Sequence, residues 1–292
     1  EKFHILLEHA GIKKGDKVAI VGRNSSNWAI CFFGILAYGA VAVPILHEFK
    51  PDNIHHIVNH SGAKAVLAGS SNWENMNEKM MPDVKLFMML DNFSIIDCKN
   101  KEVRTIRDRI NEYFGKKYPR SFTANDVKYH IEDPEELAVL NYTSGTTSFS
   151  KGVMIPYRSL WSNTQFAYDR LPFIHPGDNI VCMLPMAHMY GLAFEVLNSV
   201  NKGCHVHFLT RTPSPKIIAE HCDGSPGFDP CRATHHREDH QEQGLPRTGK
   251  AVDQIAAESA VHRPKGTRKD RPKARSLFRW KLRRNRDRRC SH

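Results

Sequence analysis

Up to about residue 220, the hydrophobic residues are spaced as in strands in some segments and as in helices in others. Short apolar runs at strand spacing alternate with segments in which apolar residues recur every three or four positions, as on one face of a helix. The runs predict strands at 17–22, 41–45, 63–68 and 84–90, and the segments between them predict helices at about 28–38, from Pro51 and near 73–80. This alternation predicts an α/β fold in which a parallel sheet carries helices on both faces.

The same alternation resumes after a polar, charged stretch at 98–132, which we interpret as a surface excursion. It predicts strands at 137–142, 153–155, 180–184 and 205–209, and helices at about 159–171, 190–200 and from Pro213. Beyond Glu220 the pattern ends, and residues 221–292 contain only six Leu, Ile or Val. We therefore expect a folded body at 1–220 and a disordered, basic tail at 221–292.

One uncharged stretch, from Trp28 to Leu46, is long enough to cross a membrane. Gly39 and Pro44 interrupt it, and residues 41–45 alternate as in a strand. We interpret the stretch as a buried helix followed by a buried strand, with Asn24, Ser25 and Ser26 as candidate helix caps. The expectation is at most peripheral membrane contact.

Charge and cysteine content narrow the class of protein. The chain has a formal net charge of +11, of which residues 221–292 contribute +9, so the body is nearly neutral. The seven cysteines form no CxxC pair, and the N-terminus does not resemble a signal peptide. We expect reduced thiols and a cytoplasmic protein, and the missing initiator Met suggests a start further upstream.

The strongest chemical signal is the hydroxyl-rich segment 142–154, which lies between two apolar strands. Its glycines permit a tight turn, successive backbone N–H groups can form an anion-binding concavity, and its lysine adds a positive charge. The phosphate-binding candidates are Thr143, Ser144, Gly145, Thr146, Thr147, Lys151 and Gly152. Unlike a Walker A loop, the lysine precedes the glycine and a strand follows. The alternative is a solvated Ser/Thr loop.

The sequence YTSGTTSFSKGV at 142–153 resembles YTSGTTGxPKGV, the signature loop of the adenylate-forming enzymes, with Ser148 in place of a glycine and Ser150 in place of a proline. Residues 16–45 are similar to the family's opening strand, helix and turn, and LPMAHMYG at 184–191 is similar to its LPLxHxxG element. The resemblance covers about 1–220 and is strongest to the long-chain fatty acyl-CoA synthetase branch.

This resemblance implies a partial large N-terminal domain of an adenylate-forming enzyme. It implies ATP-dependent activation of a fatty acid to acyl-adenylate and then to acyl-CoA, with Mg²⁺ and with coenzyme A as a substrate. The phosphate-binding candidates would bind the β- and γ-phosphates, with Lys151 as a catalytic residue. His188 would lie near the nucleotide and the acyl tunnel, although by itself such a histidine is more often an ordinary half-buried one. No metal ligand from this chain is expected.

The family's adenine, ribose and C-terminal lysine motifs do not follow Lys151, so we expect a truncated, inactive chain. When the codons compatible with 221–264 are read one nucleotide later, they permit an apolar, periodic sequence similar to the family's next segment. A frame change near Glu220 therefore explains the tail better than a functional tail does.

Two other interpretations of the tail remain open. Its spacing of Cys222, Cys231, His235, His236 and His240 fits no standard zinc site. Its Arg-rich end lacks a nucleic-acid-binding fold, so we expect no specific nucleic-acid partner. The alternative function is a non-catalytic basic protein that binds nucleic acid or anionic surfaces.

Overall fold

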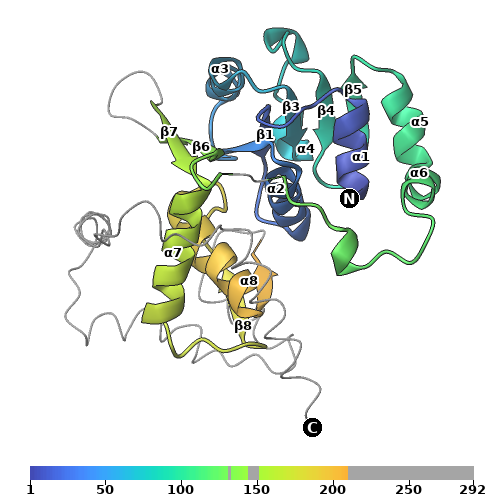
Figure 1. Ribbon diagram of the computed structural model, residues 1–292. Coiled ribbons are helices and arrows are strands. Elements are labelled where there is room, and N and C mark those ends of the chain that lie inside the picture. Colours follow the sequence, from blue (N-terminus) through green and yellow to red (C-terminus); the bar gives the residue numbers. More distant parts are fainter. Residues whose placement is uncertain (131–132, 144–150, 210–292) are drawn as a thin grey trace. The chain divides into compact units, whose positions relative to one another are not determined.

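A mixed sheet with the strand order β5-β4-β3-β1-β2-β6-β7 organises the computed structural model (Figure 1). The structure describes residues 1–130, 133–143 and 151–209. The strands of this sheet are β1 (Lys17–Val21), β2 (Val41–Ile45), β3 (Ala65–Ala68), β4 (Leu86–Met89), β5 (Ile95–Cys98), β6 (Leu137–Thr143) and β7 (Lys151–Pro156). The predictions for the helix from Pro213, the disordered tail and the zinc and nucleic-acid alternatives fall outside the described residues.

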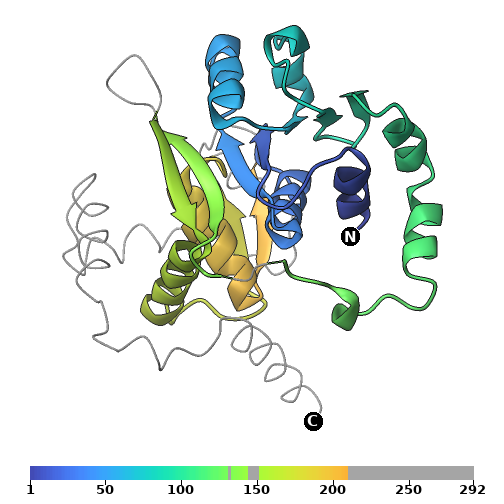
Figure 2. The same ribbon diagram turned by 45° about the horizontal axis from the view of Figure 1, so that its top comes forward.

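The five central strands are parallel, which confirms the predicted α/β class. The two edges are not parallel: β5 pairs with β4 and β7 pairs with β6 in antiparallel register. Both views show β6 and β7 as a hairpin at one edge of the sheet (Figures 1 and 2). A second, two-stranded parallel sheet contains β8 (Asn179–Cys182) and β9 (His205–Phe208).

Helices surround these strands in the described part of the chain. The α-helices are α1 (Lys2–His9), α2 (Ser26–Tyr38), α3 (Pro51–Ser61), α4 (Ser70–Trp73), α5 (Glu102–Asp108), α6 (Ile110–Lys117), α7 (Tyr157–Arg170) and α8 (Asn198–Lys202). The other helical segments are the 3₁₀ helices η1 (Glu78–Met80) and η2 (Ala124–Asp126) and the π-helix η3 (Gly191–Leu197).

The two faces of the sheet bury two separate cores because strand side chains alternate. On one face, Trp28, Phe32 and Ile35 of α2 pack in the cluster that contains Ile20. On the other face, the apolar side of α3 packs in the cluster that contains Val21. Helices α2 and α3 connect successive strands, so the chain covers both faces as the sequence predicted.

The uncharged stretch from Trp28 to Leu46 is a buried helix followed by a buried strand, as predicted. Ser25 caps α2, and its side chain accepts a hydrogen bond from the N–H of Trp28 at 3.1 Å. Among the described helices, none has the length and apolar character needed to cross a bilayer.

Two of the predicted segments were wrong. The helix predicted near 73–80 is replaced by α4 and η1, because Asn75 and Asn77 hydrogen-bond to the nearby backbone in place of a helical ladder. The stretch 98–132 is not a plain surface excursion, since it contains α5 and α6. Val103 and Ile106 of α5 are fully or almost fully buried, and these two apolar residues were hidden among charged neighbours.

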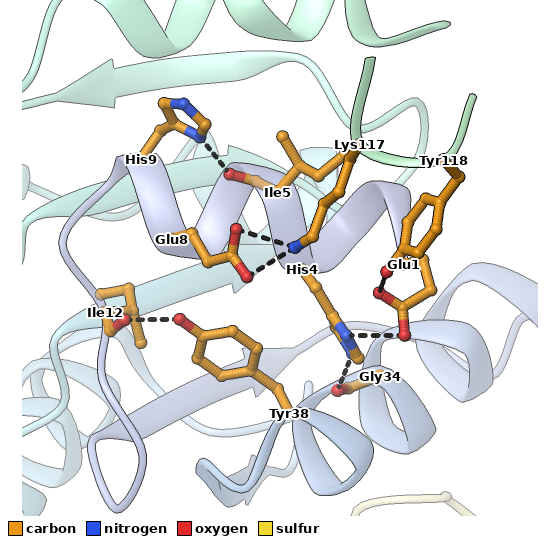
Figure 3. Close-up of polar contacts among 10 residues, drawn as sticks. All are labelled: Glu1, His4, Ile5, Glu8, His9, Ile12, Gly34, Tyr38, Lys117 and Tyr118. Atoms are coloured by element: carbon orange, nitrogen blue, oxygen red, sulfur yellow. Dashed lines mark hydrogen bonds and ion pairs between the residues drawn. The ribbon is translucent and has the colours of Figure 1, made fainter. Parts of the chain in front are cut away.

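Polar contacts hold α1 in place (Figure 3). His4 Nε2 is 2.9 Å from the Gly34 carbonyl oxygen of α2, and burial lowers the pKa of this histidine. Lys117 Nζ donates to both carboxylate oxygens of Glu8, at 2.8 and 3.0 Å. These contacts join α1 to α2 and α6, so we assign them a structural role.

Candidate functional site

The β6–β7 hairpin positions the predicted phosphate-binding segment. Thr143 is the last residue of β6 and Lys151 the first of β7, and the two are partners in the antiparallel register. Both side chains are exposed. The candidates between them, Ser144, Gly145, Thr146 and Thr147, lie outside the described residues. The structure therefore makes Thr143 and Lys151 cross-strand neighbours where the segment leaves and re-enters the sheet.

Because side chains alternate along a strand, neighbouring residues of this hairpin lie on opposite faces. Tyr142 is 4% exposed and packs in the core under α3. Its hydroxyl is 2.7 Å from His60 Nδ1 of α3, and burial raises the pKa of the phenol. Asn141 and Thr143 lie on the opposite face. Tyr142 thus anchors the hairpin to α3 immediately before the predicted loop.

Gly152 lies opposite Tyr142 in the register. A Cβ at this position would stand 3.2 Å from both Tyr142 Cζ and Leu140 Cδ1. The glycine therefore makes room for the tyrosine ring, a packing reason that sequence reasoning missed. Its predicted contact with phosphate stays a prediction.

The second predicted element, residues 184–191, follows β8 and ends at the first residue of η3. His188 in this element is exposed. Its Nδ1 accepts the backbone N–H of Tyr190 at 3.3 Å. A neutral ring with this acceptor carries its proton on Nε2. His188 can therefore offer an N–H donor to an anionic group.

A hydrogen bond joins the two elements. Asn141 Nδ2 donates to the Ala187 carbonyl oxygen at 3.1 Å. Asn141 shares a strand face with Thr143, and Ala187 directly precedes His188. The structure thus places the predicted residues Thr143, Lys151 and His188 on adjoining segments, although the last two are 37 positions apart in sequence.

Three polar residues at this junction were not predicted as site residues. Asn24 was interpreted as a helix cap, but Ser25 is the cap and Asn24 hydrogen-bonds to the 184–186 backbone. Asn141 interrupts an apolar strand, and Glu195 is the one charged residue in GLAFEVL. A lone polar residue in a buried element was the available signal in both cases.

The donor chemistry of the described residues fits a phosphate group: a hydroxyl, an ammonium and an imidazole N–H. Among the described residues, no group of three or more His, Cys, Asp or Glu side chains could hold a metal ion.

Comparisons with known proteins identify a family and relatives that this chain resembles. The profile of the AMP-binding enzyme family matches residues 4–224. A long-chain-fatty-acid–CoA ligase of Escherichia coli O6:H1 is 30% identical over an alignment of 214 residues that covers 68% of this chain and 38% of that protein. The chain thus spans well under half the length of this relative.

Two solved structures share the fold. A long-chain-fatty-acid-CoA ligase from Archaeoglobus fulgidus has a TM-score of 0.59 and 21% identity, over 75% of this chain and 40% of that one. ATP-bound MatB from Rhodopseudomonas palustris has a TM-score of 0.58 and 19% identity, over 75% and 40%.

Proposed function

Because the chain belongs to the AMP-binding enzyme family, we propose that it carries the phosphate-binding part of an ATP-dependent fatty acid–CoA ligase. The observation that carries the proposal is the hairpin that sets Lys151 beside Thr143, with the segment YTSGTTSFSKGV around it. The similarity to a long-chain-fatty-acid–CoA ligase supports a fatty acid as the acyl substrate.

In the proposed reaction a fatty acid carboxylate oxygen attacks the α-phosphorus of ATP. The bond from that phosphorus to the bridging oxygen breaks, and pyrophosphate leaves with the electron pair. The thiol of coenzyme A then attacks the acyl carbonyl carbon, loses its proton, and displaces AMP. Negative charge grows on the leaving pyrophosphate in the first step, so fixed donors near that group lower the barrier.

We assign these donor roles to the chain's own residues. The Lys151 ammonium and the Thr143 hydroxyl contact the β- and γ-phosphates, together with Ser144, Gly145, Thr146, Thr147 and Gly152. Bound Mg²⁺ would supply further charge neutralisation on the phosphate oxygens. His188 donates its Nε2–H to an oxygen of the acyl carboxylate or of the α-phosphate, because its Nδ1 is already occupied.

The remaining proposals concern organisation and setting. Residues 1–220 form the AMP-binding part and residues 221–292 the basic tail. Four cysteines among the described residues, Cys31, Cys98, Cys182 and Cys204, are free, which supports a cytoplasmic setting. No specific nucleic-acid partner is proposed.

A phosphate series tests the proposed function on the full chain. We expect affinity measured by titration calorimetry to fall from ATP to ADP to AMP, in the presence of Mg²⁺, because each step removes a phosphate that the hairpin contacts. Pyrophosphate should displace ATP, and adenosine should not. Equal affinity for ATP and AMP would contradict the proposal, as would competition by adenosine alone.

A further inference from the structure

The backbone that leads to His188, residues 183–188, forms no regular helix or strand. Its N–H and carbonyl groups instead make individual hydrogen bonds. Within this turn, the His188 N–H donates to the Pro185 carbonyl oxygen at 2.9 Å, and the His188 carbonyl accepts the Leu192 N–H at 3.0 Å. A Cβ on Gly191 would stand 2.9 Å from the same Pro185 oxygen, so the chain folds tightly here. Such a turn keeps one conformation only where its remaining backbone N–H and carbonyl groups also have hydrogen-bond partners.

Glu195 holds the first part of this segment. A single carboxylate oxygen, Oε2, accepts the backbone N–H groups of Met183 and Leu184, both at 2.9 Å. The side chain reaches back from the π-helix η3, and such π segments recur at functional sites. Burial raises the pKa of this carboxyl, while the two N–H groups act in the opposite direction.

Asn24 and Asn141 hydrogen-bond to the backbone of the rest of this segment. Asn24 Nδ2 donates to the Leu184 carbonyl oxygen at 2.8 Å, and its Oδ1 accepts the Met186 N–H at 2.9 Å. Asn141 donates to the Ala187 carbonyl oxygen. These asparagines are only 7% and 5% exposed, so water has little access to replace them. Leu184 is thus fixed at both of its peptide groups, by Glu195 and Asn24.

We propose that Glu195, Asn24 and Asn141 are positioning residues that fix the backbone of 183–187 and thereby hold His188 with its proton on Nε2. The three come from η3, the loop after β1, and β6, so they tie the histidine to the sheet that carries Lys151. A carboxylate in an apolar helix is unfavourable unless it has partners, and here its partners are the two N–H groups of this segment and the Cys182 thiol. The inference rests on the proposed function of His188.

The test uses the full chain with Glu195→Ala, Glu195→Gln and Asn24→Ala, and with Glu112→Ala as a control that removes an exposed carboxylate from α6. The first readout is amide hydrogen exchange at Met183 and Leu184. The second is the tautomer of His188, from long-range couplings of its ring nitrogens, which a purely structural role would not change.

We expect Glu195→Ala to speed exchange at both amides by roughly tenfold to a hundredfold, the loss typical of a buried hydrogen bond. The Nε2–H fraction of His188 should fall to the lower fraction of a free histidine, Glu195→Gln should restore it, and Glu112→Ala should leave both readouts unchanged. If Glu195→Ala does not fold, Asn24→Ala carries the same tautomer test. A native Nε2–H fraction of His188 in the Ala variants would overturn the proposal.

ATP titration of the same variants separates this inference from the proposed function. Loss of the tautomer preference with a matching loss of ATP affinity supports both. If the unmodified chain keeps the Nε2–H tautomer and the variants lose it, but no form binds ATP, the positioning role stands and the proposed function fails.

Discussion

Lys151→Ala should weaken ATP binding by the full chain by roughly tenfold to a hundredfold, because a hydrogen bond to a charged group contributes about 1.5–3 kcal/mol. The lysine begins β7, beside Thr143, with its side chain exposed. AMP binding should change little, since AMP lacks the β- and γ-phosphates. Titration calorimetry with both nucleotides measures the difference.

Two matched variants make this result specific. Lys79→Ala removes an exposed lysine from η1 and should leave ATP binding unchanged. Lys151→Arg keeps the charge with a different donor geometry, so it should fall between the native chain and the alanine variant. Equal losses for ATP and AMP in Lys151→Ala would mean that the lysine supports the fold, not the phosphates.

Phe32→Ala should lower the free energy of unfolding by about 3–5 kcal/mol, the usual cost of removing a buried aromatic ring. Phe32 is fully buried in α2, and its ring stacks on Trp28 with centroids 5.5 Å apart. Ile30 on the same helix is 55% exposed, so Ile30→Ala is the matched control and should cost far less. Urea unfolding followed by circular dichroism measures both.

A small effect of Phe32→Ala, similar to that of Ile30→Ala, would contradict the assignment of α2 to the core. It would also weaken the case for the hairpin geometry, because the β2–β6 pairing that places the hairpin belongs to the sheet that α2 covers.

The sequence predicted most of this fold because its strong patterns are local. The strand at 41–45 and the helix that begins at Pro51 were predicted with the observed starts, since apolar periodicity and a proline mark them directly. The helices of 98–132 were missed because their apolar positions are few and charged residues surround them. A window of residues cannot show that Val103 becomes buried by packing on distant elements.

For the candidate site, the sequence predicted the residues that would contact the ligand. It did not predict the residues that hold their backbone in place. Lys151 and His188 followed from residue types and from the resemblance. The roles of Asn24 and Glu195 depend on hydrogen bonds between residues 160 and 11 positions apart, to backbone groups that carry no sequence signature. Only the fold reveals which peptide groups need such a partner.

The most direct test of the central claim is to map pyrophosphate binding on the full chain by amide chemical shifts. We predict saturable shifts at Thr143, Lys151 and Gly152, the two sides of the hairpin, and none at Val18 in the central sheet. The same titration with Lys151→Ala should need far more pyrophosphate to reach the same shifts. Shifts that instead cluster around Arg104 and Arg107 of α5, or that leave the hairpin unchanged, would contradict the account.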